Sequence, residues 1–307
     1  MLKGGATSLA RESSARMAYR HYIPLPDFKD SYVCATNAPH VERAVVFVHG
    51  FLGHSYETWL AFQELFDRPQ SDPWWDGSDL YFFGYDSFNT SVSKTAETLL
   101  TFLDCLEPAS PDWFMVRPSD NPLYSAFAAT QLRETPTSYR ELILVGHSLG
   151  GLVLRYALLQ RLLPLKFTGL TPLASPVLQN ARLRLFAPAI NGSRPTGIKA
   201  FILSTAGPGA LARALMRQSP SYNDMLPNGA LIGPTRKSTQ DLAEQHPAVM
   251  ALRAEIVWGE SETVVSDTKY DCDQVNDSRS SGKDHVTVCK PDTLASPAVR
   301  MVRNGSF

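Results

Sequence analysis

The sequence predicts an α/β fold in which a mostly parallel central sheet is flanked by helices. Along its 307 residues, short apolar runs rich in β-branched side chains alternate with longer segments of helical periodicity, and there is no internal repeat. Hydrophobic residues make up 44% of the chain and charged residues 19%, so a large core can form. We expect an N-terminal extension over residues 1–40 and a single domain over residues 41–307.

Four apolar runs are the predicted strands. The run at residues 44–50, AVVFVHG, is continuous, rich in valine and ended by glycine, which is typical of a buried central strand. The runs at residues 79–85, 141–148 and 254–260 have the same character. Because parallel neighbours need crossover connections, we expect helices between these strands.

The segments between the runs carry helical patterns. Residues 91–106 repeat apolar side chains at helical spacing and begin with hydroxyl residues that can cap a helix. Residues 149–163 carry an apolar stripe that ends at Pro164. A helix is also predicted over residues 123–134, after a loop rich in Pro and Asp over residues 107–122.

Residues 164–250 fit the alternating pattern poorly. They contain many Pro and Gly residues, together with apolar patches such as LRLFAPAI and GALARALM. An insertion of this size before the last predicted strand is where the cover of an active site lies. We therefore expect this stretch to be part strand and part helical cap or lid.

The charge balance excludes several classes of partner. Lys and Arg total 29 and Asp and Glu total 30, so no strong field attracts nucleic acid. No apolar run reaches the roughly 18 residues of a membrane span, and the N-terminal stretch lacks the apolar centre of a secretory signal. We expect a cytoplasmic protein without a transmembrane segment, while transient membrane association and the oligomeric state stay open.

The four cysteines predict neither a disulfide scaffold nor a metal site, because they are few for this length and lack metal-ligand spacing. They are Cys34, Cys105, Cys272 and Cys289. Reduced thiols are favoured, and a pair between Cys272 and Cys289 stays open. We expect no metal and no organic cofactor.

One serine is placed as a nucleophile. The stretch from Gly146 to Gly150, GHSLG, fits G-x-S-x-G and lies between a predicted strand and a predicted helix. So sharp a turn forces Ser148 into a strained backbone conformation and leaves no room for side chains two positions away. The turn lifts the hydroxyl clear of the sheet, at a helix N-terminus that favours developing negative charge.

A second turn supplies the predicted partner of this serine. The first predicted strand ends in His49-Gly50, and Phe51-Leu52-Gly53 follows. Glycine lets the backbone approach a substrate closely, so we predict an oxyanion hole from the amides of Phe51 and Leu149. Four apolar side chains near these turns suggest either an acyl pocket or ordinary core packing; they are Phe51, Leu52, Trp59 and Leu149.

The chain order of serine, acid and histidine limits the remaining roles. Among the histidines only His246 and His285 follow far enough, and His285 lies in a polar loop before a terminal helix-like segment, as expected of a base. For the acid we favour Glu262, which follows the strand ending near Gly259. Glu260 and Asp267 stay open as alternatives.

Four segments of the chain resemble the α/β-hydrolases. They are FVHGFLG…TW, LVGHSLGGLVLRYAL, GESETVV and DHVTVCKP, within residues 44–60, 79–90, 141–163 and 254–292. The chain is similar, more narrowly, to lipase-like serine hydrolases of the SERAC-type and GPI-inositol-deacylase-type group. The resemblance covers about a third of the chain and implies the α/β-hydrolase fold.

The resemblance also implies an activity: hydrolysis of carboxylic esters, often lipids, through an acyl-enzyme. Relatives commonly carry Asp where Glu262 stands, and Asp86 in the GYDSF segment is implied to orient its loop. The expected substrate is a small ester or a lipid. Two alternatives stay open, namely an acyltransferase with the same triad and a non-catalytic binding protein of this fold.

Overall fold

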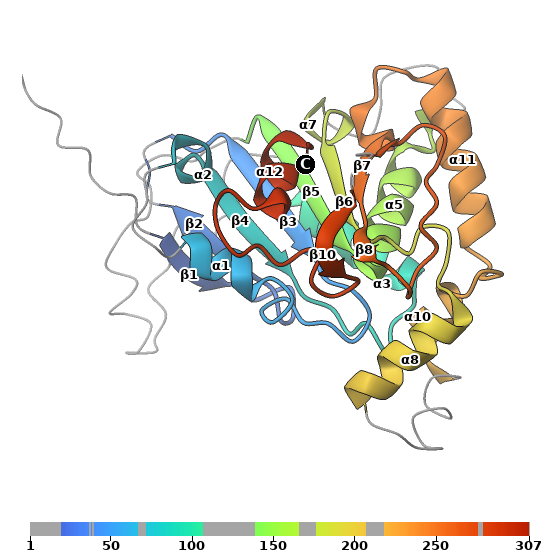
Figure 1. Cartoon of the computed structure of the whole chain (residues 1–307). Coiled ribbons are helices and arrows are strands. Elements are labelled where there is room, and N and C mark those ends of the chain that lie inside the picture. The colour runs from blue at the N-terminus through green and yellow to red at the C-terminus, as the bar shows by residue number, and fades with distance from the viewer. Residues whose placement is uncertain are drawn as a thin grey trace, which may run out of the picture.

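The computed structural model describes residues 20–36, 38, 40–66, 72–106, 139–165, 176–206, 218–275 and 279–306 (Figure 1). Within these residues an eight-stranded sheet runs in the order β1-β2-β4-β3-β5-β6-β7-β9. Its strands are β1 (Arg20–Pro24), β2 (Tyr32–Thr36), β3 (Arg43–Val48), β4 (Ser78–Phe83), β5 (Glu141–His147), β6 (Arg182–Phe186), β7 (Ala254–Val257) and β9 (Gln274–Val275). All pairings from β4 to β9 are parallel, which confirms the predicted fold class.

The predicted strands are confirmed, with one change. The three runs at residues 44–50, 79–85 and 141–148 form β3, β4 and β5 at the centre of the sheet. The run at residues 254–260 divides at Trp258 into β7 and β8 (Gly259–Ser261). Strand β8 leaves the main sheet and pairs in parallel with β10 (Ser280–Asp284), so this run serves two sheets.

Part of the predicted N-terminal extension, residues 20–36, pairs with the central sheet. Residues 20–36 form β1 and β2, and β2 pairs antiparallel with β4, with Val33 opposite Tyr81. Val33, Cys34 and Ala35 are fully buried. The sequence conceals this hairpin because β1, RHYIP, is a partly exposed edge strand without an apolar run. That the rest of the chain is one domain stays a prediction.

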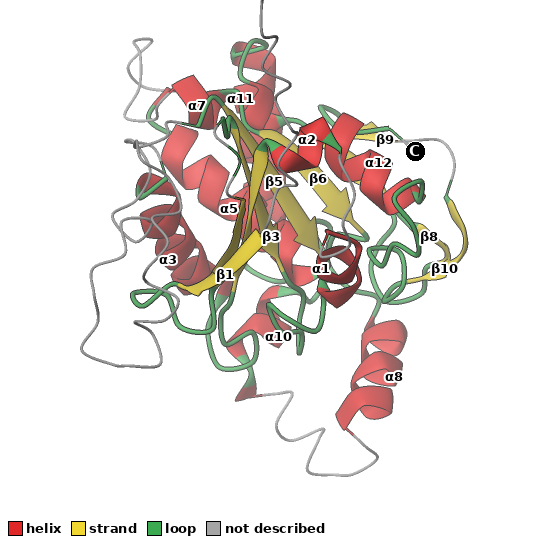
Figure 2. Cartoon of the chain, turned by 90° about the vertical axis from the view of Figure 1, so that its left-hand side faces the viewer, coloured by secondary structure: helices red, strands yellow, loops and turns green. Residues whose placement is uncertain are grey.

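Helices cover both faces of the sheet (Figure 2). On one face lie α3 (Val92–Asp104) and α5 (Leu149–Leu162), as predicted, and on the other lie α1 (Leu60–Phe66), α2 (Pro73–Asp76) and α12 (Pro297–Asn304). The hydroxyl of Ser91 caps α3 by accepting from the amide of Lys94 at 3.3 Å. The predictions for residues 107–122 and 123–134 lie outside the described residues.

The stretch 164–250 is part strand and part helix. Its strand β6 lies between β5 and β7, so this portion belongs to the central sheet. Its helices are α7 (Pro176–Gln179), α8 (Pro195–Ala206), α10 (Pro220–Asp224) and α11 (Ile232–Gln245), followed by a 3-10 turn, η2 (Met250–Leu252). In both views α8 and α10 lie at the end of the sheet where the parallel strands finish. A lid function for them stays a prediction.

None of the helices in the described ranges has the length and apolar character required to cross a bilayer. All four cysteines are free thiols, so Cys272 and Cys289 are not joined.

A buried ion pair ties α5 to the last strands. Arg155 binds the carboxylate of Asp273, and the two side chains are 1% and 0% exposed. Arg155 also donates to the carbonyl of Leu252 at 2.6 Å, and Asp273 accepts from the amide of Ala254 at 2.9 Å. Because both charges have hydrogen-bonded partners, the ion pair fixes the position of α5 relative to the segments that contain Leu252, Ala254 and Asp273.

Removing one partner of this pair leaves a buried charge unpaired. We expect Asp273→Asn to lower the free energy of unfolding by about 3–5 kcal/mol in urea denaturation. The matched control is Lys94→Met, which breaks the Lys94–Glu97 pair whose side chains are 70% and 69% exposed. That change should cost less than about 1 kcal/mol. Equal effects of the two substitutions would contradict this account.

Candidate active site

Ser148 occupies the sharp turn between β5 and α5. Its backbone has φ 52° and ψ −119°, a strained conformation for a residue with a side chain, as the sequence predicts. The amide of Ser148 donates to the carbonyl of Phe186 at 3.0 Å, and its own carbonyl accepts from Ala189 at 3.0 Å. These two bonds to the segment after β6 hold the turn in place.

The glycines around the serine have a steric reason. A Cβ atom built on Gly150 would collide with the carbonyl oxygen of Val48 and lie 2.5 Å from that of His49. A Cβ on Gly146 would lie 2.9 Å from the backbone of Gly151. The turn therefore has room only for glycine at both positions, and it brings α5 directly against the end of β3.

The structure brings Ser148, His285 and Glu262 together, although 114 positions separate Ser148 from Glu262 in numbering (262 − 148). His285 Nε2 lies 3.0 Å from the hydroxyl oxygen of Ser148. His285 Nδ1 lies 3.0 and 3.2 Å from the two carboxylate oxygens of Glu262. The three residues are only 4–5% exposed.

Glu262 is held as the partner of the imidazole by its own loop. One of its carboxylate oxygens accepts from the amides of Val264 and Val265, at 2.8 and 3.0 Å. The two alternative acids lie elsewhere. Glu260 is exposed and accepts from the amide of Gly282, and Asp267 pairs with Arg194 and Arg279. Hydrogen bonds from these partners lower the pKa of both alternative carboxyls.

His147, the residue before the serine, supports the base. Its Nε2 lies 2.7 Å from the carbonyl oxygen of His285, to which the neutral ring donates its proton. Burial and, to a smaller extent, the neighbouring His285 lower the pKa of His147 to about 3. His147 is therefore neutral at neutral pH and places no positive charge beside His285. Sequence reasoning missed this role because the motif leaves that position free.

The turn after β3 lies directly against the serine. A Cβ on Gly50 would lie 2.9 Å from the Cβ of Ser148. His49 Nδ1 donates to the carbonyl of Gly50 at 2.9 Å, so its Nε2 is free to accept from the amide of Tyr85 at 3.4 Å. The hydroxyl of Tyr85 donates to the carbonyl of His49 at 2.8 Å. Burial lowers the pKa of His49 to about 4, so this bridge is neutral.

Two amides at this turn and at the helix start face no acceptor. Within the described part of the chain, no hydrogen bond engages the backbone N–H of Phe51 or of Leu149. The next amide, that of Leu52, donates instead to the hydroxyl of Ser87 at 3.0 Å. Buried N–H groups are normally paired, so the two predicted oxyanion amides are open for a ligand oxygen.

The suggested acyl-pocket residues pack in or against the core: Phe51, Trp59 and Leu149 are buried, and Leu52 is half-buried. Trp59 is fully buried, with its ring centroid 5.0 Å from that of Phe47, so it belongs to the core. The ring of Phe51 lies 6.4 Å from that of Tyr222 in α10. The ring of Phe201 in α8 lies 5.9 Å from that of His285. Helices α8 and α10 thus contact the site itself.

The structure also shows where Asp86 and His246 lie. Asp86 accepts from the amides of Phe88 and Asn89, at 3.1 and 2.9 Å, and so orients its loop as expected. His246 lies at the end of α11 and takes no part in the triad geometry. In the described residues, no group of three metal-ligating side chains gathers in one place.

One fold places a serine on a strained turn directly after a central parallel strand, with an acid and a histidine later in the chain. The chain has the α/β-hydrolase fold. No family model and no curated protein sequence matches it.

Several solved structures of this fold are similar. One is a carboxylesterase, CesB, from Bacillus subtilis, with 12% identity over 95% of this chain and 94% of that chain and a TM-score of 0.45. Another is a monoacylglycerol lipase from Paleococcus ferrophilus, with 14% identity over 87% and 90% and a TM-score of 0.41. A third is phospholipase PlaB from Legionella pneumophila with thio-NAD, with 16% identity, 71% coverage of this chain and a TM-score of 0.39. The chain spans only 38% of that phospholipase.

The backbone strain at the serine has a measurable consequence. We expect Ser148→Gly to be more stable than Ser148→Ala by about 1 kcal/mol in urea denaturation, because glycine adopts a positive φ freely and alanine does not. Both variants lose the hydroxyl, so the comparison isolates the backbone. Alanine equal to or above glycine in stability would argue against the strained turn.

The two buried neutral histidines predict acid sensitivity. Below a pH of about 6.5, His49 and His147 take up protons in the unfolded state but stay neutral in the folded state until about pH 4 and 3. Stability should therefore fall as the pH is lowered through this window, by about 1.4 kcal/mol per pH unit for each histidine. His147→Gln should remove one such contribution from the slope measured by urea unfolding between pH 6 and 4. Thr98→Ala, which changes an exposed side chain that is not ionisable, should leave the slope unchanged.

Proposed function

We propose that the chain is a serine hydrolase that cleaves carboxylic esters, with Ser148 as nucleophile, His285 as base and Glu262 as the orienting acid. The observation that carries this proposal is the continuous chain of contacts from the Glu262 carboxylate through the imidazole to the hydroxyl, at 3.0 Å on each side. Such a chain makes a weak nucleophile reactive, because the base accepts the proton as the hydroxyl attacks.

The reaction proceeds in two halves. His285 Nε2 takes the proton of Ser148 while the hydroxyl oxygen attacks the ester carbonyl, and Glu262 stabilises the resulting imidazolium. The imidazolium then gives its proton to the leaving alcohol, which leaves an acyl-enzyme. Water, deprotonated by the same imidazole, attacks the acyl-enzyme and releases the acid and the free serine.

The oxyanion of each tetrahedral intermediate is assigned to the amides of Phe51 and Leu149. The absence of other partners for these two N–H groups among the described residues supports this role. The fixed orientation of the Gly50–Phe51 peptide supports it too, since the Gly50 carbonyl accepts from His49 Nδ1 at 2.9 Å and from the amide of Gly53 at 3.1 Å. Donors held before the reaction need no reorganisation when charge develops.

Three narrower statements belong to this proposal. The substrate is a small ester or a lipid, and the support for this is apolar: the ring of Phe201 lies 5.9 Å from that of His285. The resemblance to the SERAC-type and GPI-inositol-deacylase-type group is part of the same proposal, as is a cytoplasmic location. A lid formed by α8 and α10 accounts for their contacts with Phe51 and His285.

Substitution of the acid tests the assignment. Glu262→Gln should lower kcat for p-nitrophenyl esters by about 10⁴-fold, because the amide cannot stabilise the imidazolium. Its matched control is Glu260→Gln, in which an exposed neighbour of the same type is changed and activity should be retained. Circular dichroism of both variants checks the fold.

Covalent labelling tests the nucleophile. A fluorophosphonate should label the wild type and leave Ser148→Ala unlabelled. A folded wild-type protein that resists the probe and cleaves none of the esters would contradict the hydrolase and favour the binding protein. With a competing alcohol present, transfer of the acyl group in preference to water would favour the acyltransferase.

A further inference from the structure

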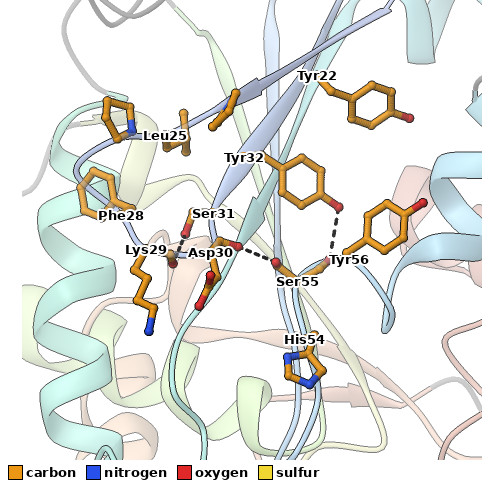
Figure 3. Close-up of a pocket in the computed structure, with 12 residues that line it drawn as sticks. Tyr22, Leu25, Phe28, Lys29, Asp30, Ser31, Tyr32, His54, Ser55 and Tyr56 are labelled. Carbon is orange, nitrogen blue, oxygen red and sulfur yellow. Dashed lines mark hydrogen bonds between the residues drawn. The ribbon is translucent and has the colours of Figure 1, made fainter.

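A separate cavity lies at the edge of the sheet where β4 ends, between the β1–β2 turn and the segment after Gly53 (Figure 3). Its volume is about 770 Å³, which lies within the range of small-molecule sites. Ser148, His285 and Glu262 do not line it, and the proposed reaction gives it no role. It does share one chain segment with the proposed oxyanion turn, since His54, Ser55 and Tyr56 follow Gly53 directly.

Three tyrosine rings gather on one side of this cavity (Figure 3). Among the described residues four large hydrophobic side chains are exposed, and two of them, Tyr22 at 43% and Tyr56 at 54%, line the cavity. The ring of Tyr32 lies 6.2 Å from that of Tyr22 and stacks on Phe82 at 4.9 Å. Exposed aromatic side chains concentrated at one cavity are typical of a binding site.

Hydrogen bonds hold the cavity in shape without a ligand. Gln63 donates both to the hydroxyl of Tyr32 and, at 3.3 Å, to the carbonyl of Tyr56. The hydroxyl of Tyr32 donates in turn to the carbonyl of Ser55 at 3.3 Å, and Ser55 donates to the carbonyl of Asp30 at 2.5 Å. A site that is already ordered loses little entropy when a ligand binds.

The lining of the cavity includes charged side chains of both signs. Lys29, Asp30 and His54 are exposed lining residues, and the described ranges contain no hydrogen bond or ion pair to their side-chain charges or ring. Lys29 and Asp30 contribute one charge of each sign to the lining, and Lys29 also interacts electrostatically with Asp86. A ligand with net charge would satisfy one of them and be repelled by the other, whereas a zwitterion satisfies both.

We propose that this cavity binds a zwitterionic head group in which a quaternary ammonium is joined to a phosphate. The tyrosine rings offer π-faces to the ammonium, with Asp30 as its counter-charge, and Lys29 binds the phosphate. A primary ammonium, which is more strongly hydrated, gains less from the rings. The head-group proposal rests on the proposed function in one respect: the zwitterion bound here is identified as the head group of the lipid ester that the enzyme cleaves.

Binding can be measured without any ester chemistry. Titration calorimetry of Ser148→Ala with glycerophosphocholine should give saturable binding at one site. Glycerophosphoethanolamine should bind at least about fivefold more weakly, since the rings favour the quaternary group by about 1 kcal/mol or more. Choline alone and inorganic phosphate should each bind more weakly than the zwitterion, and methyl glucoside should not bind.

Variants in the cavity localise the effect. Tyr56→Ala should weaken binding at least about fivefold, while Tyr56→Phe, which keeps the ring, should bind like its parent. Lys29→Gln and Asp30→Asn should each weaken binding, and Asn tolerates the φ of 58° found at Asp30. Met250→Ala removes an exposed hydrophobic side chain outside the cavity and should have no effect.

The outcomes separate this proposal from the hydrolase proposal. No saturable binding, equal affinity for glycerophosphoethanolamine, tighter binding of methyl glucoside, or an unchanged Tyr56→Ala would each overturn the head-group site. Binding by a protein that hydrolyses no ester would support the site and contradict the proposed function alone. Kinetics with dihexanoylphosphatidylcholine distinguish the two sources of the ligand. A raised KM with unchanged kcat in Tyr56→Ala would show that the cavity binds the head group of the lipid substrate. Unchanged kinetics would show that the cavity binds a free zwitterion.

Discussion

The close approach of the start of α5 to the end of β3 is the constraint on which the rest of the site depends. Gly150 lies against the carbonyls of Val48 and His49, where no side chain fits. This contact forces the positive φ at Ser148 and places the helix start beside the turn of Gly50. The proposed nucleophile and both proposed oxyanion amides therefore take their positions from one backbone contact. Bonds to Phe186 and Ala189 keep the strained turn closed.

Around this contact the polar side chains are buried, and nearly all of them form hydrogen bonds. His147 and His49 are neutral, and each uses a ring proton to hold a backbone carbonyl, the first at His285 and the second at Gly50. Glu262 is fixed by two amides of its own loop before it meets His285. Because burial lowers the pKa of both supporting histidines, neither places a positive charge beside the His285 imidazole at neutral pH.

The segment after β3 connects the proposed active site with the tyrosine-lined cavity. Its first part, from His49 to Leu52, forms the turn beside Ser148, and its next part, from His54 to Tyr56, forms a wall of the tyrosine-lined cavity. Both parts are fixed by bonds from other strands, through Tyr85 after β4 and Tyr32 in β2. The hairpin of β1 and β2 thus does more than extend the sheet, since it shapes the second cavity.

The sequence by itself determined the central strands and the serine turn. Local patterns suffice there, because a buried parallel strand is continuously apolar and a sharp turn excludes side chains. Only the tertiary structure shows that Glu262, and not Glu260 or Asp267, lies against His285, because the three carboxylates differ in the partners that reach them. It also decided the roles of His147 and Tyr85 and the place of β1 and β2. These depend on contacts between distant segments, and no local pattern in the chain encodes such contacts.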